Sequence, residues 1–513
     1  MITKRAMQND GSNPQASAWV VLAATILGSS MAFIDGTVVN VALPSLQNAL
    51  HASIADVQWV VEAYALVLAA LLLVGGSLGD ILGRRKVYVF GVGVFAAASA
   101  WCGLARSVDM LIWARSIQGL GAAFLVPGSL ALITASFPEE TRGKAIGTWS
   151  GFSAITAAVG PVIGGWLIEY STWRWVFFLN LPIALAVILL SARIPESRNE
   201  NSSHQVDWPG VLLLILGLGG VTYALIEWPT HALHGGKLVT AASVVGVFAL
   251  AGFVAVEHSS DAPTVSLKLF RSRNFSGANL LTLFLYASLS GLMFFFPMDL
   301  IEVQHYTATQ AGAAFLPFIG IMFGLSRWAG GLIARYGSRM PLAVGPLVAS
   351  CGIALFAVAP QIGTYWVTVF PAVAVMGLGM TISVAPLTTT VMNAVPESES
   401  GLASGINNAI SRLAGLLAVA VFGVILIAVF NHTLDHKLAH LALTLDVRAY
   451  IDAARPQLAS THNPDPAVQR AITESFVNGY RAVIWIASGL AALSGITAWL
   501  LIEPGAPRSA KRV

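Results

Sequence analysis

The sequence predicts an all-α polytopic membrane protein with fourteen transmembrane helices. Hydrophobic residues make up 56% of its 513 positions and charged residues only 10%, and the mean hydropathy is +0.74. A soluble domain usually carries about a quarter charged residues. The composition therefore excludes an ordinary soluble enzyme, a disordered chain and a nucleic-acid-binding protein. The net charge of +3 is too small to indicate a polyanionic partner.

Apolar runs long enough to cross a bilayer, about 20 residues each, are separated by polar turns. The first six cover residues 18–40, 57–77, 87–105, 109–133, 144–168 and 174–194. After a polar stretch, two more cover residues 208–229 and 237–257. The last six cover residues 275–297, 309–334, 340–359, 364–388, 402–430 and 480–502. The predicted order is therefore six, two and six helices.

This order divides the chain into three predicted parts. An N-terminal six-helix bundle covers residues 1–200, an inserted helix pair covers residues 201–262, and a C-terminal six-helix bundle covers residues 263–513. The last part includes the polar segment 431–479, in which leucines at helical spacing predict short amphipathic helices lying over the outer face. One interpretation of this segment is a solvated cover. The other is a docking site for a periplasmic membrane-fusion partner.

Positive charges orient the helices, because Lys and Arg are retained on the cytoplasmic side during insertion. With the N-terminus inside, 17 of the 28 Lys and Arg fall in cytoplasmic segments and eight on the outer side. We therefore expect both termini in the cytoplasm. The membrane is expected to be a bacterial inner membrane, and the protein is expected to be a monomer. Cys102 and Cys351 lie far apart in apolar runs and predict no disulfide. His436 and His440 have helical ligand spacing but no evident third ligand, so no metal site is predicted.

Two glycine-bearing helix ends indicate an internal repeat. Residues 76–86 read GSLGDILGRRK and residues 330–340 read GGLIARYGSRM, each at a basic turn. Two homologous halves are typical of alternating-access transporters. In the first copy the glycines permit a tight turn and close helix approach, and Asp80 can pair at a neighbouring helix end. In the second copy Ala334 replaces the acidic residue.

The first copy resembles the loop signature of the major facilitator superfamily. It fits the pattern G-x-L-x-D-x-x-G-R-R at Gly76, Leu78, Asp80, Gly83, Arg84 and Arg85. The resemblance implies a conformational-switch loop made of these residues, with Arg142 from the next cytoplasmic turn. In the fifth predicted helix, GPVIGG places Gly160, Pro161, Gly164 and Gly165 in a motif similar to the antiporter motif of drug exporters. Proline and glycines at this spacing kink a helix and let a neighbour pack closely.

The first predicted helix extends the resemblance to one branch of the family. Its D-G-T-V-V-N-V-A-L-P run, residues 35–44, resembles that of the fourteen-helix drug/proton antiporters, the EmrB/QacA-like branch. The R-S-I-Q-G-L-G run that begins at Arg115 is similar to the family's second motif. The resemblance covers essentially the whole chain. It implies export of small lipophilic compounds in exchange for protons, with the proton gradient as energy source and no cofactor.

Five charged residues fall deep inside predicted helices: Asp35, Glu62, Arg115, Arg327 and Arg412. Each is a functional candidate, because a charge in the bilayer costs roughly 2.5 to 3.5 kcal/mol on insertion scales. We expect Asp35 and Glu62 to carry the proton, since a desolvated carboxylate can take up or release one. Arginine cannot cycle a proton, so Arg115 would organise the site. The alternatives are permanent neutralisation of Arg115 by Asp35, and a solvated position of Glu62 at the outer rim.

Other polar and aromatic residues are candidates for a substrate cavity between the halves. They are Asn40, Trp149, Arg327, Asn407, Asn408 and Arg412. Two unpaired arginines facing the cavity would repel a dication and favour a neutral, amphipathic or anionic substrate. If they pair with Asp35 or Glu62, nothing follows about substrate charge.

The sequence thus predicts a proton-coupled multidrug efflux transporter whose partners are small molecules, protons and lipid. An exporter of a specific metabolite, siderophore or peptide on the same fold is the first alternative. The alternative of another class is a membrane-embedded lipid-modifying enzyme. The chain shows no catalytic cluster and no phosphate-binding G-x-x-x-x-G-K-[ST] run, so we expect no enzymatic activity.

Overall fold

The computed structural model describes residues 14–198, 207–231, 236–260, 265, 267–359, 363–396, 400–441, 443–461 and 463–504. These residues form helices and connecting turns, with no strand among them. Thirteen of the described helices are long and apolar enough to cross a membrane, and the shorter apolar helix Trp175–Ser191 occupies the place of the sixth predicted span. The predicted fold class is confirmed, and the helix count is consistent with fourteen.

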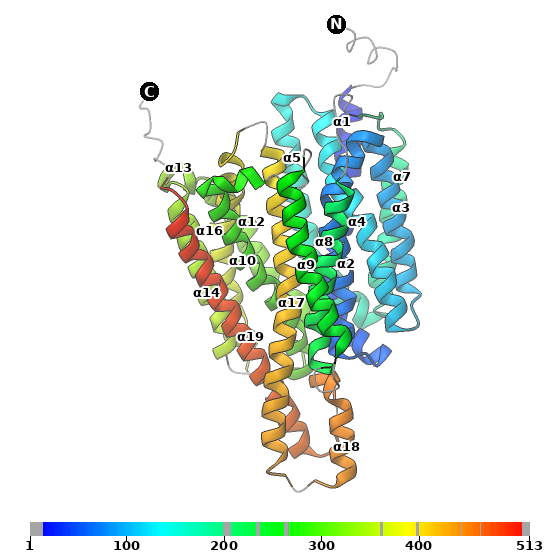
Figure 1. Ribbon diagram of the computed structural model, residues 1–513, viewed down its shortest axis with the longest axis vertical. Coiled ribbons are helices and arrows are strands. Elements are labelled where there is room, and N and C mark those ends of the chain that lie inside the picture. The colour runs from blue at the N-terminus through cyan, green and yellow to red at the C-terminus, as the bar shows by residue number, and fades with distance from the viewer. Residues whose placement is uncertain are drawn as a thin grey trace.

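The N-terminal half is a bundle of seven helices. They are α1 (Pro14–Leu50), α2 (Ile54–Leu82), α3 (Arg84–Gly103), α4 (Val108–Ser136), α5 (Glu139–Tyr170), α6 (Trp175–Phe178) and α7 (Asn180–Ser191). α4 packs between α2 and α3, while α1 packs against α5 and α7 (Figure 1). Glycine makes the α4 contacts close: a Cβ atom at Gly121 would lie 2.5 Å from the backbone nitrogen of Phe95 on α3. The backbones therefore meet almost directly.

The C-terminal half repeats this organisation with more interrupted helices. Its elements are η2 (Leu267–Arg271), α10 (Arg273–Met298), the π-helix η3 (Asp299–Val303), α11 (Ala308–Ala313), α12 (Leu316–Gly330), α13 (Leu332–Tyr336), α14 (Arg339–Val358), α15 (Tyr365–Thr368), α16 (Phe370–Asn393), α17 (Ser400–Leu438) and α19 (Pro466–Leu501). The single helix predicted over residues 309–334 is divided into α11, α12 and α13. Pro317 lies in the first turn of α12, where its missing backbone N–H removes no intrahelical hydrogen bond.

The inserted pair, α8 (Trp208–His231) and α9 (Lys237–Ser259), lies against the seam between the halves. α8 contacts both α2 and α17. At this junction Ala55, Ile226 and Ala420 form one buried apolar cluster. The indole Nε1 of Trp59 donates a hydrogen bond to Glu227 Oε1 at 3.0 Å. The pair thus bridges the two halves on one side of the bundle.

The segment predicted as an outer loop, residues 431–479, continues the flanking helices at both of its edges. α17 runs on to Leu438, α19 already begins at Pro466, and α18 (Leu445–Ala454) and η5 (Arg455–Ser460) lie between them. Together they form a hairpin that projects from the bundle (Figure 1). The segment thus contains short helices, α18 and η5, as the sequence predicted, but the prediction missed that its two edges belong to the extended helices α17 and α19. The physical reason is its buried apolar stripe, which packs the extended helices together through Leu434, Leu438, Val468, Ile472 and Phe476.

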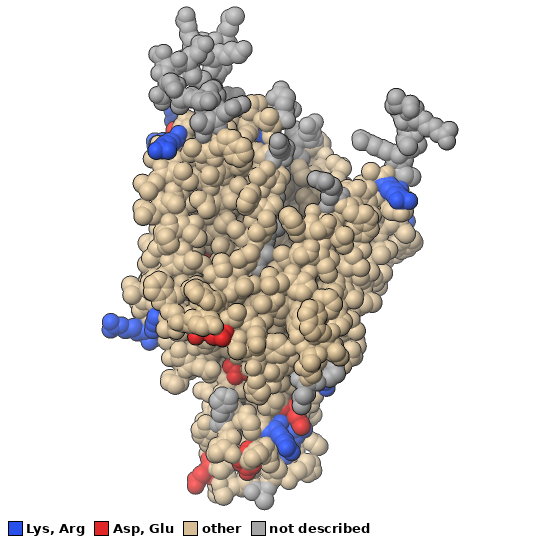
Figure 2. Space-filling model, turned by 180° about the vertical axis from the view of Figure 1, so that it is seen from behind, with Lys and Arg blue, Asp and Glu red and all other residues tan. Residues whose placement is uncertain are grey.

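The two ends of the bundle differ. α1 begins and α19 ends at the same end, here called the upper end, and the hairpin lies at the lower end (Figure 1). At the lower end α5 and α11 meet backbone to backbone: a Cβ atom at Gly312 would lie 2.1 Å from the carbonyl oxygen of Pro161. Toward the upper end the molecule is hollowed between the halves (Figure 2). The two halves are therefore in contact at the lower end and separated at the upper end.

Candidate functional site

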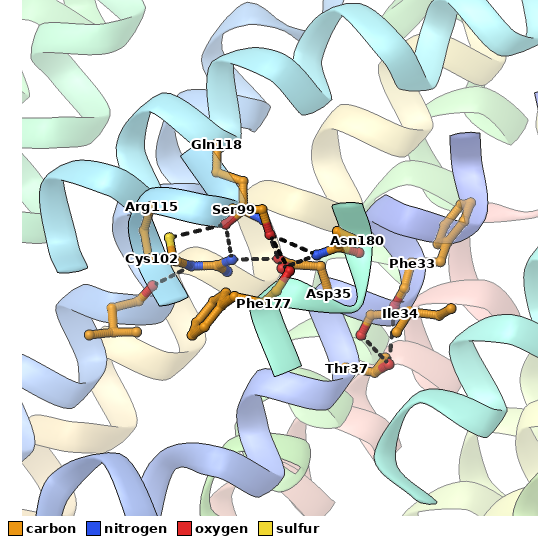
Figure 3. Close-up of polar contacts among 11 residues, drawn as sticks. Phe33, Ile34, Asp35, Thr37, Ser99, Cys102, Arg115, Gln118, Phe177 and Asn180 are labelled. Carbon is orange, nitrogen blue, oxygen red and sulfur yellow. Dashed lines mark hydrogen bonds and ion pairs between the residues drawn. The ribbon is translucent and has the colours of Figure 1, made fainter. Parts of the chain in front are cut away.

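Asp35 of α1 and Arg115 of α4 form a buried ion pair inside the N-terminal half (Figure 3). Asp35 is completely buried and Arg115 is 1% exposed. Arg115 Nη1 donates to Asp35 Oδ2 and, at 2.7 Å, to Gln118 Oε1. Its Nε donates to the carbonyl oxygen of Val60 on α2 at 3.0 Å. A buried pair is tolerated only when hydrogen bonds satisfy its remaining atoms in this way.

Neutral side chains from three helices complete the Asp35 environment. Gln118 Nε2 donates to Asp35 Oδ1 at 2.8 Å, and Asn180 Nδ2 approaches the same oxygen at 3.4 Å. Asn180 Nδ2 also donates to Ser99 Oγ at 3.0 Å (Figure 3). Sequence analysis placed Gln118 in the family's second motif, but it assigned no role in the site to Gln118, Ser99 or Asn180. Gln118 could have been found, because it lies three residues after Arg115 and therefore on the same helix face.

Tyr64 of α2 extends this network inside the N-terminal half, where its side chain is only 4% exposed. The guanidinium carbon of Arg115 lies 4.3 Å from the centre of the Tyr64 ring, a cation–π contact. Gly119 lets α2 and α4 approach this closely, since a Cβ atom there would lie 2.5 Å from the carbonyl oxygen of Tyr64. The ring is thus held at a fixed position beside Arg115.

Glu62 of α2 lies in a different environment from Asp35. It is 1% exposed, and its Oε2 is buried without a hydrogen-bond partner among the described residues. The solvated rim position considered from the sequence is therefore not what the structure shows. Glu62 follows Gln58 by one helical turn, so both lie on the face that contacts α17. A buried carboxylate without partners is costly to ionise.

Two of the predicted substrate-cavity residues lie on α17. Arg412 is half-buried and makes no ion pair or hydrogen bond within the described part of the chain. It interacts electrostatically with Tyr64 of α2 and Tyr286 of α10. Asn408, one turn before it, is exposed. The structure therefore does not pair Arg412 with Asp35, whose partner is Arg115.

The other cavity candidates are distributed over both halves. Asn407 Nδ2 donates to Asn279 Oδ1 at 3.0 Å and to Thr282 Oγ1 at 2.7 Å, so it ties α17 to α10. Trp149 Nε1 donates to Ser29 Oγ at 3.0 Å, between α5 and α1. Asn40 is half-buried on α1. The side chain of Arg327 lies outside the described residues.

The predicted switch loop forms a compact turn at the upper end. Arg84 Nε donates to Asp80 Oδ1 at 2.9 Å. Gly83 has a φ of +114°, a conformation that favours glycine. Glu196, which the sequence did not mark, accepts from the backbone nitrogen of Arg85 at 3.0 Å and satisfies the start of α3.

Two further members of the predicted loop take no part in this turn. Gly76 lies within α2, where a Cβ atom would be 3.8 Å from Pro127, an ordinary contact. Arg142 Nε is buried without a hydrogen-bond partner among the described residues.

The glycines of the antiporter motif hold α5 between the two halves. Cβ atoms at Gly160 and Gly164 would lie 2.4 Å from Thr37 Oγ1 and 2.0 Å from Val38 Cγ2, both on α1. On the opposite side, a Cβ atom at Gly165 would lie 2.3 Å from the carbonyl oxygen of Ala308 on α11. The motif therefore makes α5 the close-packed contact between the N-terminal half and the lower end of the C-terminal half.

Two helical halves around a hollow, with charges buried at mid-depth, define a membrane transporter of the alternating-access class. The comparison with known families agrees. The family model described as Major Facilitator Superfamily matches residues 25–419, and the chain belongs to this family.

Several curated relatives match the chain over nearly its whole length. The "Multidrug resistance protein Stp" of Mycobacterium tuberculosis (strain ATCC 25618 / H37Rv) is 32% identical, with 94% of this chain and 91% of that protein covered. The "Puromycin resistance protein pur8" of Streptomyces alboniger is 33% identical, with 96% and 92% covered. The "Tetracenomycin C resistance and export protein" of Streptomyces glaucescens is 30% identical, with 94% and 91% covered.

Solved structures share the fold at low sequence identity. A bacterial homologue of the human lysosomal transporter Spinster, inward-facing and unoccupied, superposes with a TM-score of 0.65 at 19% identity, covering 95% of this chain and 98% of the other. The POT family transporter PepTSo superposes with a TM-score of 0.63 at 14% identity, covering 96% and 98%. At these identities the likeness concerns the fold alone.

Proposed function

We propose that the protein is a proton-coupled exporter of small lipophilic or amphipathic compounds. Its relatives carry names of drug resistance, export and efflux. The observation that carries the proton role is Asp35, a fully buried carboxylate at the centre of a network that spans α1, α2, α4 and α7. The hollow toward the upper end supplies a route for the exported compound (Figure 2).

The network provides a mechanism for coupling. Arg115 and Gln118 donate hydrogen bonds to the two carboxyl oxygens of Asp35. Proton uptake by Asp35 removes the charge that holds Arg115, while Val60 and Tyr64 continue to hold the guanidinium on α2. Protonation therefore loosens α1 from α4 and biases the N-terminal half toward the opposite state. Glu62, buried on the face toward α17, is the second candidate proton carrier.

The orientation belongs to the same proposal. Because most Lys and Arg of the turns fall on the side of the termini, the upper end faces the cytoplasm of a bacterial inner membrane. The compound enters the hollow from inside and leaves at the lower end, and the protein works as a monomer without an enzymatic step. An exporter of one specific metabolite would use the same machinery.

The proposal is tested in inside-out vesicles with Asp35→Asn, which keeps the side-chain volume and removes the ionisable group. We expect loss of gradient-driven dye export, while the variant still inserts and elutes as a single species in detergent. Asp109→Asn, an exposed carboxylate in the first turn of α4, is the matched control and should export normally. Export by Asp35→Asn at the unsubstituted rate would exclude the proton role of Asp35.

A further inference from the structure

We propose that Arg412, with Tyr64 and Tyr286, binds an anionic or hydrogen-bond-accepting group of the exported compound. The preferred substrates are then anionic and neutral aromatic amphipaths, and dications are disfavoured. This inference rests on the proposed export function and specifies the substrate class of its central cavity.

Arg412 lies near the middle of the membrane-crossing part of α17. The helix α17 begins at Ser400, twelve residues before Arg412, which corresponds to about 18 Å at 1.5 Å per residue. The hydrocarbon core of a bilayer is about 30 Å thick. A charge at this depth is retained only where it faces protein or a water-filled cavity. Because Arg412 is half-buried and forms no hydrogen bond or ion pair among the described residues, we place its side chain toward the hollow.

The register of α2 against α17 places Tyr64 at the same level of the bundle as Arg412. Gln58 Nε2 donates to the carbonyl oxygen of Val419 at 2.8 Å, which fixes the two antiparallel helices at this level. Tyr64 lies six residues further along α2, and Arg412 seven residues back along α17, so both lie about 10 Å closer to the upper end. The electrostatic interactions of Arg412 with Tyr64 and Tyr286 agree with this register. A ligand at Arg412 therefore touches both halves.

The balance of charge around the hollow favours an anion. Arg115 is neutralised by Asp35, and both are shielded at 1% exposure or less. Glu62 is also buried, at 1% exposure, so its carboxylate does not reach solvent at this level. Arg412 is thus a mid-depth cation that meets solvent without a counter-ion among the described residues. A guanidinium binds carboxylate, phenolate and carbonyl oxygens through its planar donors, and it repels cations.

The surroundings of Arg412 suit an aromatic ligand. The Tyr64 ring is held against Arg115 at 4.3 Å and does not need to be ordered by the ligand. Tyr64 itself is only 4% exposed, whereas Tyr286 presents a half-buried ring with a hydroxyl group. Asn408 lies one turn from Arg412 on the same face of α17 and is exposed, which adds an amide donor and acceptor. Aromatic walls with a few polar groups are typical of small-molecule sites.

The test compares two dyes with the same xanthene core and opposite charge, fluorescein and tetramethylrhodamine methyl ester. Their binding to purified protein in nanodiscs is measured by fluorescence polarisation, without a proton gradient. We expect Arg412→Gln to weaken fluorescein binding about tenfold or more and to leave the binding of the cationic ester unchanged or stronger. Arg412→Lys keeps the charge and should recover part of the fluorescein affinity. Tyr286→Phe should weaken fluorescein binding by a smaller factor.

Arg335→Gln is the matched control, because Arg335 is an exposed cation of the same half on α13. It should change neither affinity. The inference is overturned if Arg412→Gln affects both dyes equally or neither, or if the unsubstituted protein does not bind fluorescein. Failure of the export function gives a different result, in which the unsubstituted protein binds fluorescein through Arg412 but vesicles export neither dye.

Discussion

Single glycines decide how closely the two halves meet. The Cβ atom that Gly312→Ala adds would lie 2.1 Å from the carbonyl oxygen of Pro161, and this oxygen belongs to backbone that cannot rotate away. We expect Gly312→Ala to open the lower end and to lower stability by about 1–3 kcal/mol, the usual cost of overpacking. Thermal unfolding in detergent and dye export in vesicles measure the two effects.

Gly320→Ala is the control for this prediction. Gly320 lies on the adjacent helix α12 with no atom within 4 Å of an added Cβ. Alanine there should stabilise the helix by up to about 1 kcal/mol through its higher helix propensity. If Gly312→Ala and Gly320→Ala had the same thermal stability and the same export rate, the α5–α11 contact would not be what holds the lower end closed.

Gly83 is constrained by its backbone as well as by its neighbours. Its φ of +114° is strained for any L side chain, and an added Cβ would lie 2.7 Å from Glu196 Oε1. We expect Gly83→Ala to destabilise the turn by about 1–3 kcal/mol. The readout is the thermal midpoint, compared with Gly93→Ala on α3, where an added Cβ meets nothing within 4 Å. A midpoint for Gly83→Ala that matches the control would show that the turn tolerates the substitution.

At the residue scale, the buried charged residues could be predicted from the sequence, whereas the neutral residues that hydrogen-bond around them could not. Asp35 and Arg115 could be predicted as site residues, because a charged side chain inside an apolar run is costly and is retained only where it has a function or a partner. The partners Ser99 and Asn180 could not, because a neutral polar residue in an apolar run is common and nothing local shows which helix it faces. Asn180 reaches Asp35 because α7 packs against α1, and Ser99 joins the network because α3 packs against α7.

Among the elements, the hairpin reaches from the C-terminal half to the N-terminal half. Its base, η5, contacts α1 and α2 as well as α17 and α19. Gln47 Nε2 of α1 donates to the carbonyl oxygen of Gln457 at 3.1 Å, and Ser460 Oγ donates to Gln47 Oε1 at 3.3 Å. The hairpin therefore fastens the halves at the lower end, and these hydrogen bonds must break when that end opens.

A reversible crosslink tests this fastening. A bifunctional methanethiosulfonate that joins the two cysteines of Gln47→Cys/Ser460→Cys should abolish export, and reduction should restore it. The background needs Cys351→Ser, because Cys351 is exposed, whereas Cys102 is buried. Joining Lys437→Cys to Glu474→Cys, an ion pair between α17 and α19 within the hairpin, should leave export intact. If the first crosslink is formed and export continues, the hairpin does not open in the transport cycle.

The elements themselves were predictable where apolar runs were long and separate. The sequence could not show that α17 and α19 extend beyond these runs, because hydropathy detects the part that lipid surrounds and misses a helix continued by mutual packing. It also could not show the breaks between α11, α12 and α13, since proline and glycine are tolerated inside many membrane helices.

For the molecule as a whole, the contacts between the halves are unequal on its two sides. α8 covers the seam of α2 and α17 through the cluster of Ala55, Ile226 and Ala420. On the other side α5 meets α11 directly at the lower end. Neither seam could be predicted from the sequence, because contacts between apolar helices leave no charge or periodicity signal that separates them from lipid-facing surface.

Alternating access makes a prediction about paired distances. Spin labels at Leu82→Cys and Met392→Cys lie at the upper ends of α2 and α16, and labels at Leu104→Cys and Trp366→Cys lie at the lower end, all at exposed positions in different halves. If the halves rock as rigid bodies, a transported dye should shorten the upper distance and lengthen the lower one in the same fraction of molecules. Double electron–electron resonance measures both. The pair Leu82→Cys and Leu104→Cys, within one half, should not change. Shortening of the upper distance with a constant lower distance would indicate occlusion without rocking and would contradict the coupling of the two ends through α5 and α11.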